Sequence, residues 1–215
     1  MDPQIVYVIL VVCFLILSLG VHEAAHAWVA DLCGDDTAKR EGRLTLNPVP
    51  HIDPVMTILL PAILAFSGGP IFGGARPVPV NPMRLRHPLR DMMLVALAGP
   101  ISNFLQAIVY MVVWKILVNH VGMATESLAV RVIGATVYFN LILTIFNMIP
   151  VPPLDGSRVM AYLLPPSLRE PYVGLERFGL LIVFALFLSG AFLAILSAAI
   201  DPLFEAVNIL SGGTW

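Results

Sequence analysis

The sequence predicts an all-α integral membrane protein: a bundle of about four transmembrane helices plus a re-entrant segment with short β-structure. It predicts one membrane-embedded domain over residues 1–215. The first observation is composition, since 58% of the residues are hydrophobic, only 12% are charged, and the mean hydropathy is +0.88. Soluble domains carry about a quarter charged residues, so lipid is the expected solvent. The second is a set of apolar stretches of about 20 residues, the length that crosses a bilayer as a helix.

Four stretches are long enough to be spanning helices, and they cover about residues 5–28, 92–118, 131–150 and 178–200. The first contains no charge between Ile5 and Leu19. No Lys or Arg precedes it, and it lacks a small-residue cleavage site. We therefore predict a retained transmembrane helix rather than a signal peptide.

The basic residues predict the side on which each connection lies. By the positive-inside rule, residues 31–53, 73–91 and 156–177 are expected to be cytoplasmic. Alternation then puts the N-terminus, the loop near residues 120–130 and the C-terminus outside. The basic residues that support this topology are Lys39, Arg40, Arg43, Arg76, Arg84, Arg86, Arg90, Arg158, Arg169 and Arg177.

The apolar segment at residues 55–72 joins two predicted cytoplasmic segments, so it should enter and leave the membrane on one side. It is too short to cross comfortably and contains a breaker cluster, Ser67-Gly68-Gly69-Pro70. We expect a re-entrant element over about residues 55–80. The alternative is a short fifth crossing helix, which would leave four arginines outside.

Two prolines at the end of this segment predict a strand that can pair along one edge only. Pro77 and Pro79 lack N–H groups on the same side of an extended chain, whereas Arg76, Val78 and Val80 keep theirs on the other side. Such an edge could hydrogen-bond to an unwound peptide. The alternative is a rigid loop without strand pairing.

The first apolar stretch ends in His22-Glu23-Ala24-Ala25-His26, an H-E-x-x-H motif. On a helix this spacing places two imidazoles one turn apart on one face, where they can share a Zn²⁺ ion, and leaves the glutamate beside them as a general base. Ionisable groups at membrane depth are costly, so the motif indicates a functional metal site.

A catalytic zinc site takes three protein ligands and keeps one open position, and Asp155 is the candidate for the third ligand. It follows the third helix at its predicted cytoplasmic end, which is also where the first helix carries its histidines. Prolines before it end the helix and free the backbone to turn the carboxylate inward. They are Pro150, Pro152 and Pro153.

With these motifs in place, the chain resembles the site-2 protease family of intramembrane zinc metalloproteases, of peptidase M50 type, and its short bacterial branch in particular. The resemblance covers about residues 5–165. Three motifs carry it: H-E-x-x-H, A-G-P-x-x-N and N-x-x-P-x-x-x-L-D-G. The matching residues are His22, Glu23, His26, Ala98, Gly99, Pro100, Asn103, Asn147, Pro150, Leu154, Asp155 and Gly156.

The resemblance implies hydrolysis of peptide bonds in or near transmembrane segments of membrane proteins in the cell membrane, with one Zn²⁺ per chain. It also favours Asn147 near the bound substrate. Asn140 lies on the same helical face seven residues earlier, and we take both as candidate substrate-binding residues. The alternative for both is hydrogen bonding between helices, which is common in membranes and is the role we expect for Asn103.

The remaining polar residues carry no predicted chemistry. His51, His87 and His120 are expected to be ordinary loop residues, and the two cysteines, Cys13 and Cys33, predict no disulfide framework. The net charge of −2 points to no nucleic-acid partner. Two other functions stay open: a non-enzymatic scaffold in which the metal only ties helices together, and, less favoured, a metal-ion transporter.

Overall fold

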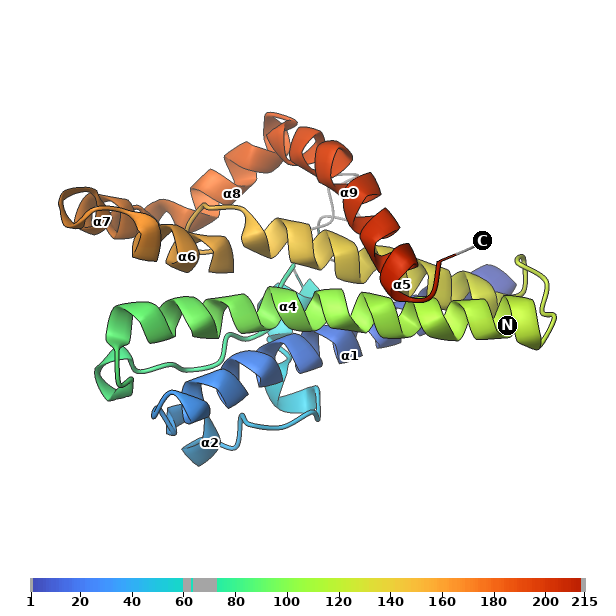
Figure 1. The fold of residues 1–215 in the computed structure, drawn as a ribbon, viewed down its shortest axis with the longest axis horizontal. Coiled ribbons are helices and arrows are strands. Elements are labelled where there is room, and N and C mark those ends of the chain that lie inside the picture. Colours follow the sequence, from blue (N-terminus) through green and yellow to red (C-terminus); the bar gives the residue numbers. More distant parts are fainter. Residues whose placement is uncertain (1, 60–62, 64–72, 214–215) are drawn as a thin grey trace.

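The structure is a computed structural model that describes residues 2–59, 63 and 73–213. Its regular elements are all helical within those residues, and Figure 1 shows their arrangement. The α-helices are α1 (Pro3–Leu32), α2 (Thr37–Arg40), α4 (Pro88–Lys115), α5 (Leu128–Met148), α6 (Asp155–Leu163), α7 (Pro166–Val173), α8 (Gly179–Leu188) and α9 (Ala191–Leu210). Shorter 3₁₀ or π segments are Val49–His51, Pro54–Leu59, Pro82–Arg84, Ile116–His120 and Gly174–Phe178.

The centre of the molecule is a three-helix bundle of α1, α4 and α5, whose axes are roughly aligned in Figure 1. The ring of Phe14 on α1 packs edge-on against that of Tyr110 on α4, with centroids 5.9 Å apart. Arg131, at the start of α5, lies over the ring of Tyr7 near the start of α1. The colour gradient in Figure 1 shows that α4 runs antiparallel to α1 and to α5.

The surface of this bundle is apolar where it faces outward, as a membrane protein requires. Leu105 and Val109 on α4 and Ile5 on α1 are about half exposed. Inside, α4, α5 and α9 share an apolar cluster of Ala107, Met111, Val137, Leu141 and Val207. Exposed apolar side chains have no unfavourable water contact when lipid is the solvent, so this outer face is stable in a bilayer.

The first three predicted spanning helices correspond to α1, α4 and α5 with small shifts of their ends. The fourth, predicted as one helix over residues 178–200, is wrong, because the chain bends at Ser189–Gly190 between α8 and α9. Gly190 has φ 75°, in the left-handed region that favours glycine, so the helix cannot continue there. Among the described residues, five helices or helical runs are long and apolar enough to span a membrane, where about four were predicted: 3–32, 88–120, 128–148, 166–188 and 191–210.

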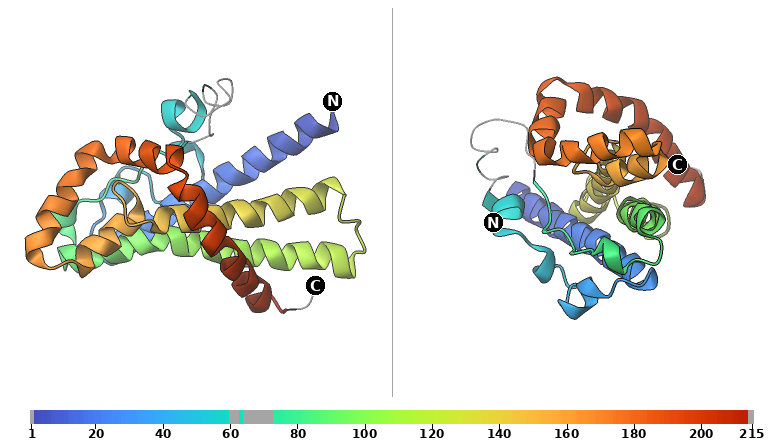
Figure 2. Two further views of the ribbon diagram at one scale, coloured as in Figure 1. Left: turned by 90° about the horizontal axis from the view of Figure 1, so that it is seen from above. Right: turned by 90° about the vertical axis from the view of Figure 1, so that its left-hand side faces the viewer.

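Helices α8 and α9 form an inverted V in Figure 1, and α9 descends across α5 and α4. The buried Lys115 fixes the end of α9. Its Nζ donates hydrogen bonds to the Asn208 Oδ1 (2.7 Å), the Asn208 carbonyl (2.9 Å) and the Ser211 hydroxyl (2.9 Å). A cation at the C-terminal end of a helix binds the carbonyls that lack partners there. The end of α9 and the start of α1 therefore lie toward the same end of the bundle (Figure 2).

The predicted re-entrant segment lies partly outside the described residues, at 60–62 and 64–72. Its two described flanks are bonded to each other: the Gly74 amide donates to the Met56 carbonyl (3.1 Å), and the Thr57 hydroxyl donates to the Gly74 carbonyl (2.6 Å). The predicted β-structure is wrong for residues 73–80, which contain no strand. Their amides are used locally, since Arg76 donates to the His51 carbonyl (2.7 Å) rather than to a neighbouring strand.

Candidate metal centre

Helix α1 carries His22, Glu23 and His26 at buried positions, and the two histidines contact α4. The two imidazoles are 4% and 8% exposed, and Glu23 is 8% exposed. The histidine rings lie edge to face with centroids 4.6 Å apart, which brings their Nε2 atoms to 3.0 Å. The helical spacing of four residues produces this approach, because residues i and i+4 lie one above the other on one face.

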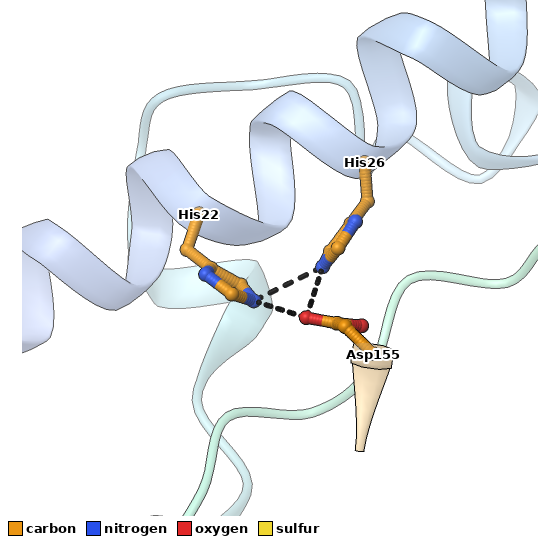
Figure 3. A group of neighbouring side chains, drawn as sticks. All are labelled: His22, His26 and Asp155. Carbon is orange, nitrogen blue, oxygen red and sulfur yellow. Dashed lines mark hydrogen bonds and ion pairs between the residues drawn. The ribbon is translucent and has the colours of Figure 1, made fainter. Parts of the chain in front are cut away.

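Asp155 reaches the same point from the other side. Helix α5 ends at Met148, the proline-containing residues 149–154 leave the helical path, and α6 begins at Asp155. A Cβ on Gly156 would lie within 2.7 Å of the Ile149 carbonyl oxygen, so only glycine lets α6 pack this closely against the end of α5. The Asp155 Oδ2 lies 3.3 Å from His22 Nε2 and 3.4 Å from His26 Nε2 (Figure 3).

The resulting group of three donor atoms fits a zinc ion. Zinc bonds to nitrogen and oxygen are about 2.0–2.1 Å long, so ligand atoms in a tetrahedral site lie about 3.3 Å apart. The three distances here are 3.0, 3.3 and 3.4 Å. Asp155 Oδ2 is buried, and no hydrogen bond of standard geometry reaches it from the described residues. A buried carboxylate oxygen facing two imidazole nitrogens is best satisfied by a cation.

The other nitrogen of each imidazole is held by α4. His26 Nδ1 lies 2.7 Å from the Val95 carbonyl oxygen, and His22 Nδ1 lies 2.5 Å from Asn103 Oδ1. Both oxygens are acceptors, so each Nδ1 carries the hydrogen, and the neutral ring then has its lone pair on Nε2. That is the form in which a histidine binds a metal through Nε2.

Gly99 of α4 packs directly against the two imidazoles. A Cβ at this position would lie 2.5 Å from both Cε1 and Nε2 of His22 and would also clash with His26 Nε2. The glycine therefore leaves the space between α4 and the three donor atoms open. The sequence connected Gly99 only with close helix packing, and the structure places it at the site itself.

Residues 76–78 lie next to Glu23. Two side chains hold them there: Glu23 itself, on α1, and Arg43, in the connection between α1 and α4. The Val78 amide donates to Glu23 Oε2 (2.9 Å). Arg43, only 5% exposed, donates through Nη2 to the Arg76 carbonyl (2.6 Å) and to the Pro77 carbonyl (3.3 Å). Sequence reasoning used Arg43 only as a cytoplasmic charge. In a single sequence, no pattern distinguishes an arginine that is buried in the fold from one that is exposed.

A cavity of about 470 Å³ lies beside the three donor atoms. Glu23 and Asn147 line it together with the three donor side chains, and an ion pair between Arg158 and Glu176 (2.6 Å) also borders it. Asn140 is not among the lining residues. It is fully buried and bonded to Ser18 and Asn103. His51, predicted to be an ordinary loop residue, is in a short 3₁₀ turn but is buried, with Nε2 3.0 Å from the Thr45 carbonyl oxygen.

Two histidines and an aspartate around one point, beside a glutamate and a cavity inside a helical membrane protein, define the class of intramembrane metalloproteases. Comparisons agree. The sequence model described as "Peptidase family M50" matches residues 114–190, which include Asp155 but not the H-E-x-x-H motif. A Bacillus subtilis protein named "Putative zinc metalloprotease YwhC" is 41% identical over 181 residues, covering 81% of this chain and 78% of that protein.

Two mycobacterial relatives, both named "Putative zinc metalloprotease Rip2", are more distant. The Mycolicibacterium smegmatis protein is 28% identical over 85% of this chain and 68% of its own length, and the Mycobacterium tuberculosis protein is 26% identical over 84% and 67%. No solved structure matches the chain. The chain belongs to peptidase family M50, the site-2 protease family, and is an intramembrane zinc metalloprotease that acts on membrane proteins.

Proposed function

We propose that His22, His26 and Asp155 hold the catalytic Zn²⁺ and that Glu23 is the general base for hydrolysis of a peptide bond in or near a transmembrane segment. The observation that carries this proposal is the triangle of donor atoms, with sides of 3.0–3.4 Å, next to a buried glutamate and an open cavity. A structural metal site would have no use for the free carboxylate, so the scaffold alternative is not favoured.

A zinc ion held by these three residues would act as a Lewis acid, which would polarise the scissile carbonyl and make water acidic enough to attack near neutral pH. Glu23 takes the proton from the attacking water and delivers it to the leaving amine. The Val78 amide holds Oε2 of Glu23, which fixes the carboxylate and leaves its other oxygen to accept the proton. Arg43 keeps Val78 in place through the two carbonyls before it.

Asn147 is the residue we propose for substrate binding. It lines the cavity near the end of α5, and its Nδ2 donates to the Leu143 carbonyl (3.1 Å), which leaves the amide oxygen as an acceptor for a peptide N–H group. Asn140 is fully buried, and its side chain is hydrogen-bonded to Asn103, Ser18 and Thr136. Its role in substrate binding stays a prediction from the sequence.

We expect that chelation abolishes cleavage of a membrane-anchored reporter by the purified protein, and that one Zn²⁺ per chain restores it. The measurement is reporter cleavage in detergent or liposomes together with metal content. Mg²⁺ serves as the control, since a His₂Asp site suits zinc and magnesium prefers all-oxygen ligands. Cleavage that persisted at zero zinc content would contradict the proposed mechanism.

We also propose that residues 1–215 form one domain, and we propose an orientation for the chain in the membrane. We propose that the ends of the chain are outside and that the metal centre opens toward the cytoplasm. Supporting this, the two segments on either side of residues 55–72 both carry basic residues, and Met56 and Gly74 are hydrogen-bonded to each other. Flanks that are hydrogen-bonded to each other lie at the same depth, which supports placing both on one side of the membrane.

Cysteine labelling tests this topology. In a background without Cys13 and Cys33, membrane-impermeant reagent should modify cysteines at Asn47 and at Met83 from the same, cytoplasmic, side. Both positions are exposed. A cysteine at Ala124, in the exposed loop between α4 and α5, is the control and should react only from the opposite side. Labelling of positions 47 and 83 from opposite sides would make residues 55–72 a true crossing.

A further inference from the structure

A chain of buried amide side chains connects the interior of α5 to His22. Asn103 on α4 contacts His22 Nδ1 through Oδ1 (2.5 Å), and Asn103 Nδ2 donates to Asn140 Oδ1 on α5 (2.9 Å). Both asparagines have 0% exposure. We propose that Asn103 and Asn140 are positioning residues that act as one relay and hold His22 in the tautomer that binds zinc. The inference rests on the proposed role of His22 as a ligand.

The direction of the relay is set at its α5 end. Asn140 lies 3.0 Å from the Thr136 carbonyl oxygen, which can only accept a hydrogen bond, so the NH₂ group of Asn140 must be on that side. Its Oδ1 then faces Asn103, and only the NH₂ group of Asn103 can satisfy it. This orientation presents Asn103 Oδ1 to His22, so His22 Nδ1 must donate and its lone pair lies on Nε2.

Without Asn140, Asn103 could reverse its amide. The NH₂ group would then point at His22 Nδ1, which would accept, and the neutral ring would carry its hydrogen on Nε2, the atom that faces Asp155. A ring in that state cannot bind zinc through Nε2. The energetic role of Asn140 is therefore to disfavour the reversed amide, since reversal would place the Asn103 oxygen against the Asn140 oxygen in a buried site.

The second histidine shows why His22 needs this support. His26 Nδ1 is held by the Val95 carbonyl, a main-chain acceptor that cannot reverse. His22 is held by a side-chain amide, which can present either an oxygen or an NH₂ group. A second amide anchored to a main-chain carbonyl gives His22 the same fixed acceptor that His26 has directly.

Zinc affinity of the full-length protein, measured by competition with a chelator, tests the relay without relying on activity. Removal of hydrogen-bond partners of metal ligands costs roughly 10–100-fold in affinity, and we expect Asn103→Leu to fall in that range and Asn140→Leu near roughly tenfold. The double variant should bind zinc no more weakly than Asn103→Leu, because Asn140 acts only through Asn103. Asn140→Asp, with its buried carboxyl group protonated, keeps an oxygen for Asn103 and an O–H donor for the Thr136 carbonyl, and should stay within roughly threefold of wild type.

Ser18→Ala is the matched control. The Ser18 hydroxyl accepts from Asn140 Nδ2 (3.0 Å), so this change removes the direct link between Asn140 and α1 while the Thr136 carbonyl still orients the amide. Wild-type affinity is expected. If Asn140 served only to join helices, Ser18→Ala would weaken zinc binding as Asn140→Leu does, and that result would overturn the relay. Wild-type zinc affinity in Asn103→Leu would also overturn the relay.

Two further measurements keep the outcomes separate. If a leucine variant fails to fold, the alanine variant at the same position is used instead, because it removes the same hydrogen bonds. Undiminished zinc affinity in His22→Ala would refute the metal site itself rather than the relay, because His22 would then not be a ligand. A large loss in His22→Ala, with all asparagine variants at wild-type affinity, would refute the relay alone.

Discussion

Replacing Glu23 with glutamine is expected to reduce cleavage of a transmembrane reporter by roughly 10² or more, because general-base assistance is worth at least that much. Zinc content should remain near one ion per chain, since Glu23 is not one of the three proposed ligands. Glutamine has the same shape, and its oxygen can still accept the hydrogen bond that the Val78 amide makes to Glu23. The substitution therefore removes the base and keeps the local structure.

The matched control is Glu126→Gln, the same exchange at an exposed position between α4 and α5, and it should leave both activity and zinc content unchanged. Parallel measurement of zinc by atomic absorption separates loss of the base from loss of the metal. Cleavage at the wild-type rate in Glu23→Gln would mean that another group takes the proton, and the mechanism proposed for this site would have to be abandoned.

The residues of the candidate metal centre could be singled out in the sequence because each of the two motifs that supply them has its own local pattern. The spacing of His22 and His26 fixes their common face on any α-helix. Asp155 has no local connection to them, but the length of the spanning helices fixes its depth, and two groups at one depth in a small bundle lie close together. The structure brings all three donor atoms within 3.4 Å.

The features that the sequence did not predict depend on side chains that meet only in the folded protein. Gly190 bends the fourth predicted helix, yet one glycine inside an apolar run is often tolerated in a membrane helix. Pro77 and Pro79 suggested a strand edge, but the amides between and before them bind Glu23 and the His51 carbonyl instead. Asn103 was expected to be structural, and its contact with His22 is visible only once α1 and α4 are packed.

Asp155→Ala tests the part of the site that spans the greatest distance along the chain. Loss of a ligand should exceed the cost of losing a ligand's hydrogen-bond partner, so we expect zinc affinity to fall by more than roughly 100-fold, with loss of cleavage. Asp155→Asn should also be impaired, because the amide keeps the shape but removes the negative charge that balances Zn²⁺. Asp155→Cys supplies a thiolate, a good zinc ligand, and should retain more zinc than alanine.

The control is Asp201→Asn, an exposed carboxylate on α9, which should bind zinc as the wild type does. Metal content and chelator competition measure all four variants under one set of conditions. The order expected is wild type and Asp201→Asn first, then Asp155→Cys, then Asp155→Asn and Asp155→Ala. Full zinc occupancy in Asp155→Ala would remove Asp155 from the site, because an ion held by His22 and His26 alone would need its third ligand from another residue that lines the cavity.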